Sequence, residues 1–302
     1  MSYRALANLN AMFQRLVICT DFSDGLYRFV NFVSSFADGG VKQLIFLHSV
    51  PFVERNNVPR INEEGIKQAQ ERLSIALNNL PPDIDVQVEV ECGNPVDLIL
   101  KVVSKYAADL VVTGTPTRSL LAEKFFGSTT VALVQRLTVP LMVMRPQLIA
   151  TYTSEELSLR CRHLCRFLLV PYHGSPASKY LVQQLKQRFQ PSIELQLHLC
   201  WVVDGMRRRD LPTDYQLASA RKELETIAAA LGTSDIMVDP VEVREGDPLT
   251  EVLAAAQEAD VSAIVTSSSV PNKLLSWSAP QFTDELLRRS WHPILYFPPP
   301  RS

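Results

Sequence analysis

Short apolar runs alternate with longer amphipathic segments along the whole chain. In the first half, five apolar runs rich in Val, Ile and Leu cover residues 15–20, 43–50, 84–91, 109–114 and 140–145. Runs of this length are typical of strands that are buried on both faces. Between them, residues 65–79 and 95–105 carry apolar side chains at helical spacing, and Pro95 suits the first position of a helix. Alternating strands and helices predict a parallel sheet with helices on both faces.

The second half repeats this pattern with its motifs in the same order. RLVICTDFS (15–23) resembles FLLVPYHGS (167–175), and LTVPLMVM (137–144) resembles SWHPILYF (290–297). VEVECGNPVDLILKVVSKYAADLVVTG (88–114) also resembles VEVREGDPLTEVLAAAQEADVSAIVTS (241–267). A repeat of this length indicates two copies of one domain. We therefore predict an α/β protein with two tandem doubly wound parallel-sheet domains of five strands each, at 13–147 and 164–299, with a linker at 148–163.

Composition and charge restrict the kinds of partner. Of the 302 residues, 46% are hydrophobic and 21% are charged, and the formal net charge is −2. A near-neutral chain has no global attraction for nucleic acid or for anionic lipid. We find no run of about 18 apolar residues and no pattern typical of a secretory signal. We therefore expect a cytoplasmic protein that binds neither nucleic acid nor membranes.

The cysteines agree with a reducing compartment. Their number is odd and they are scattered through the chain, at Cys19, Cys92, Cys161, Cys165 and Cys200. This argues against a disulfide framework. Cys161, His163 and Cys165 lie close together in the sequence, but no second cluster with ligand spacing follows. We therefore predict no metal site.

The loop between the fourth strand and the next helix carries the candidate chemistry. Gly114 and Gly127 lie at its ends, and Ser128 and Thr129 follow in the first turn of the expected helix. Free N–H groups at a helix start suit a phosphate, and Asp21, at the end of the first strand, can accept hydrogen bonds from a base or a ribose. Alternatively, Ser128 only caps the helix, Gly127 only turns the chain, and Asp21 or Ser23 only caps the helix expected to begin near Asp24. The residues by themselves leave both interpretations open.

Other catalytic and phosphate-binding motifs are missing from the sequence. It contains no G-x-x-x-x-G-K-[ST], no G-x-G-x-x-G after a strand, no G-x-S-x-G and no H-E-x-x-H. His48 ends an apolar run, and we expect a packed or capping histidine there rather than a general base. We predict that the protein is not an enzyme, with a slow ATPase activity as the alternative.

Five motifs in order resemble the universal stress protein family. They are VICTDFSD, LIFLHSV, GNPVDLIL, ADLVVTGT and FGSTTVALVQRLTVPLMVMRP. The resemblance covers nearly the whole chain, twice, and so indicates a tandem member. It implies a five-stranded parallel sheet with helices on both faces in each half. It also implies that such domains pair, so we expect an intramolecular pseudo-dimer of the two halves and a possible homodimer.

Some members of this family bind ATP through the pattern G-x2-G-x9-G-[ST]. Here the pattern falls on Gly114, Gly127 and Ser128, but Thr117 replaces the middle glycine and Pro116 beside it lacks an N–H donor. By resemblance, the first domain binds ATP or AMP, with Mg²⁺. Asp21 and Ser49 would lie at the adenine, and Ser128 and Thr129 at the phosphates. The complete candidate surface is Thr20, Asp21, Ser49, Thr113, Gly114, Thr117, Gly127, Ser128 and Thr129.

The second half departs further from this pattern. Its counterparts of the three glycines, the hydroxyl residue and Asp21 are Ser267, Val270, Pro280, Gln281 and His173. We expect no nucleotide there, and Trp277 lies either in a contact patch or in a lid on its own domain. Two functions stay open. One is a stress-response module that binds nucleotide in its first half and an unidentified protein through its second. The other is an interaction module in which both sites are degenerate.

Overall fold

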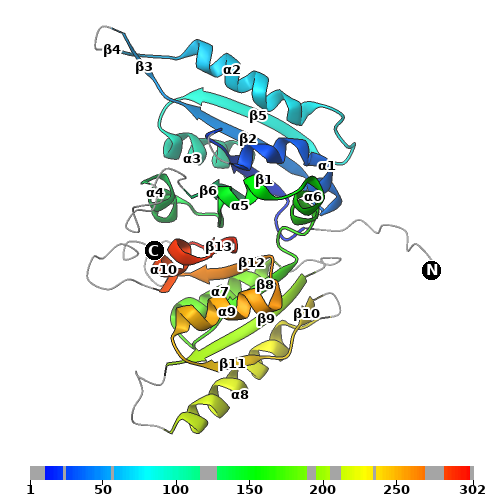
Figure 1. Ribbon diagram of the computed structural model, residues 1–302, viewed down its shortest axis with the longest axis vertical. Helices are drawn as coiled ribbons and strands as arrows, with labels where there is room; N and C mark the ends of the chain where they lie inside the picture. The colour runs from blue at the N-terminus through cyan, green and yellow to red at the C-terminus, as the bar shows by residue number, and fades with distance from the viewer. Residues whose placement is uncertain are drawn as a thin grey trace, which may run out of the picture. The chain divides into compact units, whose positions relative to one another are not determined.

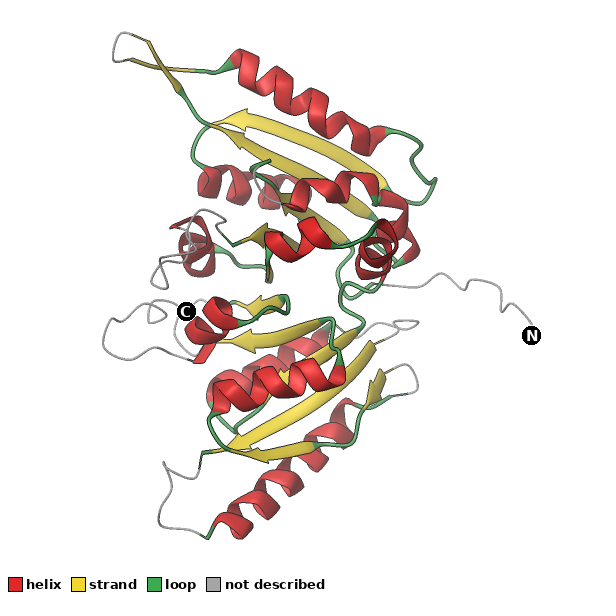
Figure 2. Cartoon of the chain, in the orientation of Figure 1, coloured by secondary structure: helices red, strands yellow, loops and turns green. Residues whose placement is uncertain are grey.

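The computed structural model describes residues 11–22, 25–55, 58–115, 128–188, 195–204, 212–233, 236–268 and 282–299 (Figures 1 and 2). The chain divides into two compact units, one of which is Phe13–Arg162, whereas the other contains the chain from His163 onward. In each unit the strands are flanked by helices, as Figure 2 shows. The two-domain α/β fold that the repeat predicted is therefore present.

The first domain is built on one parallel sheet. Its strands are β1 (Arg15–Cys19), β2 (Gln43–Val50), β5 (Asp85–Cys92), β6 (Leu110–Gly114) and β7 (Leu141–Met144). Strand β1 pairs with β2 on one side and with β6 on the other, β2 pairs with β5, and β6 pairs with β7. All five begin and end within one residue of the ranges that hydropathy predicted. Four consecutive residues of β2, Leu44 to Leu47, are buried, so both faces of the sheet are covered.

Helices cover this sheet, among them the two that the sequence predicted at 65–79 and 95–105 and the one expected after the loop that ends at Gly127. The helices are α1 (Val33–Asp38), α2 (Glu63–Leu73), α3 (Pro95–Tyr106) and α4 (Ser128–Arg136), with 3₁₀-helices η1 (Gly25–Asn31) and η2 (Ser74–Leu77). The segment predicted at 65–79 thus changes from α to 3₁₀ at Ser74. Helix α2 packs on β2 and β5, whereas α3 packs on β1 and β2. An antiparallel hairpin that hydropathy did not predict, β3 (Val53–Arg55) and β4 (Val58–Arg60), extends from the end of β2 (Figure 1).

The repeated motif Gly-Asn/Asp-Pro is a helix start. The Asn94 side chain accepts a hydrogen bond from Val96 N at 2.9 Å, and Pro95 is the first residue of α3. In the second domain, Asp247 Oδ1 accepts from Thr250 N at 2.9 Å, in front of Pro248. A side-chain cap followed by proline satisfies N–H groups that the helix leaves unpaired. The motif therefore fixes the same strand-to-helix turn in both domains.

The segment expected as a linker, 148–163, is largely helical and packs on the first domain. It contains most of α5 (Pro146–Thr151) and all of α6 (Ser154–Arg162), which lie against η1 and α1. A Cβ atom on Gly25 would lie 2.6 Å from the carbonyl oxygen of Pro146 and 2.7 Å from the amide nitrogen of Ala150. Only glycine therefore lets α5 approach η1 this closely. The exact domain boundaries stay predictions.

The second domain repeats the sheet with one change. Its strands are β8 (Phe167–Pro171), β9 (Leu195–Val203), β10 (Ile236–Val238), β11 (Glu242–Glu245), β12 (Ala263–Ser267) and β13 (Ile294–Phe297). Strand β12 pairs with β8 and β13, and β8 pairs with β9. Both β10 and β11 pair with β9, in the place that β5 alone has in the first domain. Pro240, between them, has no N–H for the ladder, so the expected fifth strand is divided into two.

The described residues of this domain form four helices. They are α7 (Pro176–Gln187), α8 (Thr213–Leu231), α9 (Pro248–Ala259) and α10 (Phe282–Arg289). Helix α8 packs on β9, β10 and β11, and α9 packs on β9 and α10.

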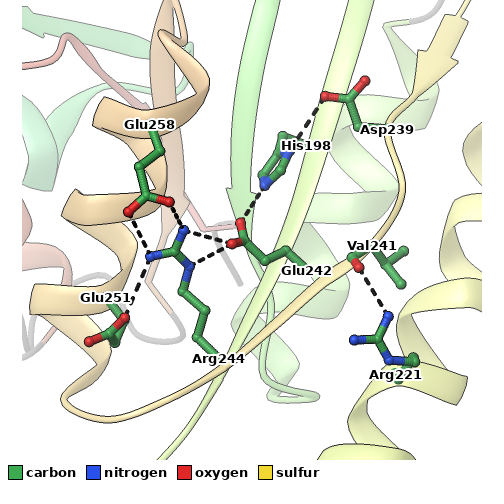
Figure 3. Close-up of polar contacts among 8 residues, drawn as sticks. All are labelled: His198, Arg221, Asp239, Val241, Glu242, Arg244, Glu251 and Glu258. Carbon is green, nitrogen blue, oxygen red and sulfur yellow. Dashed lines mark hydrogen bonds and ion pairs between the residues drawn. The ribbon is translucent and has the colours of Figure 1, made fainter.

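A charged network connects the short strand β11 to its neighbours (Figure 3). The Arg244 guanidinium lies 2.6 Å from Glu242 Oε1 and from Glu258 Oε2, and 3.5 Å from Glu251 Oε2. Glu242 Oε2 also accepts a hydrogen bond from His198 Nε2 at 2.7 Å. Burial by itself raises the pKa of Glu242, whereas hydrogen bonds from His198 and Arg244 lower it and hold the pKa below its ordinary 4.5. The network thus joins β11 to β9 and to α9.

Removing the guanidinium should cost far more than removing an outer carboxylate. The Arg244 side chain is 15% exposed, whereas that of Glu258 is 67% exposed. We expect Arg244→Met to lower the free energy of unfolding by about 2 kcal/mol, because it leaves half-buried carboxylates without a counter-charge. The matched variant Glu258→Gln should cost only ~0.5 kcal/mol, because its pair is exposed to water. Urea denaturation measures both, and equal losses would contradict this account.

The stability of the second domain should also depend on pH through Glu242. Because the pKa of Glu242 is lower in the folded than in the unfolded chain, its contribution is present above about pH 4.5 and is lost as the pH falls through the folded pKa. We expect the free energy of unfolding to decrease between about pH 5 and about pH 3, and Glu242→Gln to decrease less steeply. Denaturation curves across this range test the difference in slope, and parallel slopes would count against the role of Glu242.

Candidate functional site

The candidate site lies where the order of strands in the first domain reverses. From β1 the chain continues to β2 and β5 on one side, then returns to β6 and β7 on the other. Ligands of open parallel sheets bind beyond the carboxyl ends of the strands at such a switch point. Thr20 and Asp21 follow β1, and Thr113 and Gly114 end β6. The structure therefore brings these predicted residues to one edge of the sheet.

Two polar groups of Thr20 form hydrogen bonds within the protein that stabilise the turn after β1. The buried Thr20 donates its N–H to Leu47 O at 3.1 Å, and its Oγ1 accepts from Phe22 N at 3.2 Å. Ser49 Oγ donates to Gly93 O at 2.8 Å and so ties the end of β2 to the end of β5. Asp21, in contrast, is exposed. Of the two residues predicted at the adenine, Asp21 is exposed, whereas Ser49 is half-buried.

Three side chains that sequence reasoning did not place in the site are stacked next to Asp21. Phe22 has φ +62°, which costs a residue other than glycine about 1 kcal/mol. Its ring centroid lies 4.3 Å from that of His48, and the Arg72 guanidinium of α2 lies 4.0 Å from the Phe22 ring. The cation–π contact and the ring contact offset the strain of the turn. Hydropathy gives no signal for this stack, because its members come from three separate elements.

His48 has the packing role that its position in the sequence indicated. Its Nδ1 lies 2.7 Å from the carbonyl oxygen of Thr20, which can only accept, so Nδ1 carries the proton. Burial lowers the pKa of His48, and the hydrogen bond to Thr20 and the nearby Asp21 oppose this only in part. The ring is therefore neutral at physiological pH and holds the turn after β1 to β2.

On the other side of the switch point, a buried hydroxyl group has no partner in the described part of the chain. Thr115 follows β6 and donates its N–H to Met144 O at 2.9 Å. Its Oγ1 is buried and has no hydrogen-bond partner among the described residues. An unsatisfied buried hydroxyl costs about 1–3 kcal/mol, so such groups commonly face a ligand or ordered water. The sequence did not single out Thr115, because burial and lack of a partner are tertiary properties.

The rest of the predicted phosphate loop lies outside the described residues. This holds for Thr117 and Gly127, and for the side chain of Ser128, whose backbone begins α4. Thr129 lies half-buried in the first turn of α4, and Thr113 is buried within β6. The helix start that the sequence predicted after the loop is thus in place, and the contacts of the loop stay predictions.

The matching edge of the second domain has its hydroxyl groups bonded internally. Ser267 Oγ donates to Phe297 O at 2.8 Å, and Ser268 Oγ lies 2.8 Å from the Tyr296 hydroxyl. Thr266 Oγ1 likewise lies 2.8 Å from Thr283 Oγ1. Among the described residues at the end of β12, no buried hydroxyl group therefore lacks a partner as Thr115 does. Val270, Trp277, Pro280 and Gln281 lie outside the described residues.

In the described part of the chain, no helix is both long and apolar enough to cross a membrane. Over the same residues, no group of three or more His, Cys, Asp or Glu side chains is placed to hold a metal ion.

Solved structures resemble the chain over nearly its whole length. A universal stress protein from Archaeoglobus fulgidus has a TM-score of 0.62 and 17% identity, over 94% of this chain and 97% of that one. A functionally unknown protein from Pseudomonas aeruginosa has a TM-score of 0.60 and 13% identity, over 95% of this chain and 93% of that one. At these identities the likeness establishes the fold. A search of curated protein sequences gave no significant match.

The sequence profile of the universal stress protein family matches the chain twice, over residues 12–145 and 166–298. The two matches together cover most of the chain and correspond to the two sheets described above. The chain therefore belongs to the universal stress protein family and carries the family's domain in tandem.

Proposed function

We propose that the protein is a cytoplasmic stress-response module whose first domain binds an adenine nucleotide, ATP or AMP, with Mg²⁺. The observation that carries this proposal is Thr115 Oγ1, which is buried next to Gly114 at the switch point of the sheet and has no hydrogen-bond partner among the residues that the structure describes. A phosphate oxygen or a bound water there would satisfy a group that is otherwise costly to bury. The exposed Asp21, beyond the neighbouring strand, supplies an acceptor for ribose hydroxyls or a base amino group.

The described residues fit such a ligand in part. The first turn of a helix has N–H groups without an intrahelical partner, which suit phosphates, and α4 begins directly after the loop with Thr129 in its first turn. We propose a binding role rather than catalysis, because His48 is neutral and hydrogen-bonded to the main chain, so it is poorly placed to act as a base. In the second domain we propose no nucleotide, because its corresponding hydroxyl groups are bonded internally.

A second candidate function is a protein-interaction module without nucleotide. Thr117 and Pro116 favour it, because they replace a family glycine and remove an N–H donor in the phosphate loop. The hairpin after β2 also exposes apolar side chains of the kind that contact other proteins, Phe52, Val58 and Ile61. Pairing of the two domains within the chain, or of two chains, is compatible with either function and stays part of the proposal.

Calorimetry with ATP and AMP, with and without Mg²⁺, tests nucleotide binding. We expect saturable heat, with Asp21→Ala weakening the affinity about tenfold, because it removes a charged acceptor at the base end. Thr115→Val, which keeps the shape of the side chain, should weaken ATP binding by a similar factor. The matched control is Asp83→Ala, an exposed aspartate before the opposite, amino end of β5, which should bind like the unmodified protein.

Three results would decide against this proposal. No heat at millimolar nucleotide rejects binding and leaves the interaction module. Equal weakening by Asp83→Ala and Asp21→Ala would show a general charge effect rather than a site. ATP hydrolysis that both Asp21→Ala and Gly127→Trp abolish would replace the binding role with catalysis. Hydrolysis that persists in both variants would instead come from a contaminant, and the calorimetry alone would then decide whether nucleotide binds.

A further inference from the structure

The outer edge of the first sheet is one continuous strand. Strand β5 pairs with β2 on one side, and no described strand pairs with it on the other side (Figure 1). Its eight residues contain neither proline nor glycine. The edge of a sheet presents N–H and C=O groups that can pair with a further strand. Strand β5 is therefore a surface that a second extended chain can join.

The hydrogen bonds to β2 show which backbone groups of β5 point outward. Asp85 N donates to Lys42 O at 2.8 Å, and Gly93 N donates to Val50 O at 3.0 Å. Successive residues of a strand direct their N–H and C=O groups to opposite sides. The odd-numbered residues of β5 therefore pair with β2, and the even-numbered residues face the outer edge. These residues are Val86, Val88, Val90 and Cys92.

The corresponding edge of the second domain is protected against such pairing. Pro240 lies between β10 and β11 and has no N–H group. Gly246 N donates to Val203 O, so by the same alternation the odd-numbered residues around β11 point outward. Of these, Val241 has its carbonyl oxygen 3.5 Å from an Arg221 guanidinium nitrogen of α8 (Figure 3). Proline and covering side chains are common ways to protect a sheet edge, and β5 has no proline.

The acidic side chains of β5 are paired with lysines of α3. Lys101 Nζ lies 2.7 Å from Glu91 Oε2, and Lys105 Nζ lies 2.6 Å from Glu89 Oε1. Burial by itself raises the pKa of Glu89, but hydrogen bonds from Lys105 and Tyr106 outweigh it and hold the pKa below its ordinary 4.5. Glu89 is therefore an ionised acceptor whose charge is partly offset. The carboxylates of β5 do not form an unbalanced row that would repel a second strand.

We propose that β5 pairs with β5 of a second copy of this chain, antiparallel, around a two-fold axis at Val88. This register sets Val88 opposite Val88 of the partner subunit, and Val86 opposite Val90 of the partner subunit. The outward N–H and C=O groups of both strands then meet and pair. A two-fold axis makes the interface self-complementary and closes the assembly at two chains. This pairing uses the first domain alone and does not rest on nucleotide binding.

Charge complementarity favours this register over its neighbours. Side chains directly opposite each other in an antiparallel pair lie on the same face and interact. With the axis at Val88, Gln87 lies opposite Glu89 of the partner subunit, so an amide can donate to a carboxylate twice in each dimer. An axis at Glu89 would set the two glutamates against each other, and an axis at Gln87 would set Asp85 against Glu89. In the proposed register Asp85 faces Glu91, but at the ends of the ladder, where Glu91 is already paired with α3.

A proline at the axis tests the pairing in the full chain. We expect the mass measured by analytical ultracentrifugation to rise with concentration from that of one chain to that of two. Val88→Pro removes an N–H group that does not pair with β2, so it should weaken the dimer at least about tenfold, because each dimer loses two hydrogen bonds. The matched control Val243→Pro makes the same change at an outward-pointing residue of β11 and should leave the dimer unchanged. Single chains at every concentration, or equal losses in both variants, overturn the proposal.

Charge changes at Gln87 test the register without a proline. Gln87→Glu sets a carboxylate opposite Glu89 twice in each dimer and should weaken it about fivefold, whereas Gln87→Lys should strengthen it by a similar factor. Circular dichroism checks that both variants are folded. Equal effects of the two changes, or effects of the opposite sign, overturn the proposal.

Amide hydrogen exchange distinguishes this interface from any other that joins two chains. The N–H groups of Gln87 and Glu89 pair with β2, so they should be protected at every concentration. The N–H groups of Val86, Val88 and Val90 should become protected only as the dimer forms. A dimer in which these three amides exchange as fast as in the single chain would use another surface and would overturn the proposal.

Discussion

Burial of a parallel sheet on both faces is the constraint on which the rest of this structure depends. Leu16, Val17 and Ile18 of the central strand β1 are completely buried, and burying each such side chain stabilises the fold by about 2 kcal/mol. That burial requires helices on both faces. Because connections between parallel strands are right-handed, helices cover both faces only if the order of the strands reverses within the sheet. The reversal between β1 and β6 leaves an edge where two strand ends diverge. The candidate nucleotide site is a consequence of this geometry.

The tandem repeat places the same edge in a second context, where the side chains have changed and the backbone has not. The strand pairings of β1 and β8, the capped turns before α3 and α9, and the left-handed residue after each first strand are the same in kind. Against this constant backbone, Phe22 and Arg72 are replaced by Gly174 and Glu223. Arg72 lies over the Phe22 ring, whereas Glu223 accepts a hydrogen bond from Tyr172 at 3.0 Å. The two domains therefore differ in side-chain charge and volume at the carboxyl edge of the sheet. These side chains lie outside the core, so the difference does not disturb the burial of the strands.

Each domain also carries stabilising contacts that the sheet alone does not explain. In the first, the helices after β7 dock through Gly25, where only hydrogen leaves room for the backbone of α5. In the second, the network around Arg244 holds a strand that Pro240 has interrupted. Each contact therefore stabilises an element of its own domain, α5 in the first and β11 in the second.

The sequence alone determined the elements and their order. Runs of apolar residues specify burial, and capping residues specify helix starts, so the strands of the first domain and the turn at Asn94 could be predicted from local pattern. The hairpin after β2, the split strand and the docking of residues 148–163 could not, because they depend on which surfaces meet. The resemblance located Asp21 and Gly114, but not Thr115, whose buried hydroxyl has no partner among the residues that the structure describes.

The tertiary structure decided which side chains share a site. Phe22 and Arg72 are 50 residues apart in the chain, and Tyr172 and Glu223 are 51 residues apart. Hydropathy encodes whether a residue is buried, but not which neighbour it contacts, because that depends on how each helix is rotated against the sheet. The sequence therefore specified two copies of one fold, whereas only the packing of α2 and α8 set a cation over one turn and a carboxylate over the other.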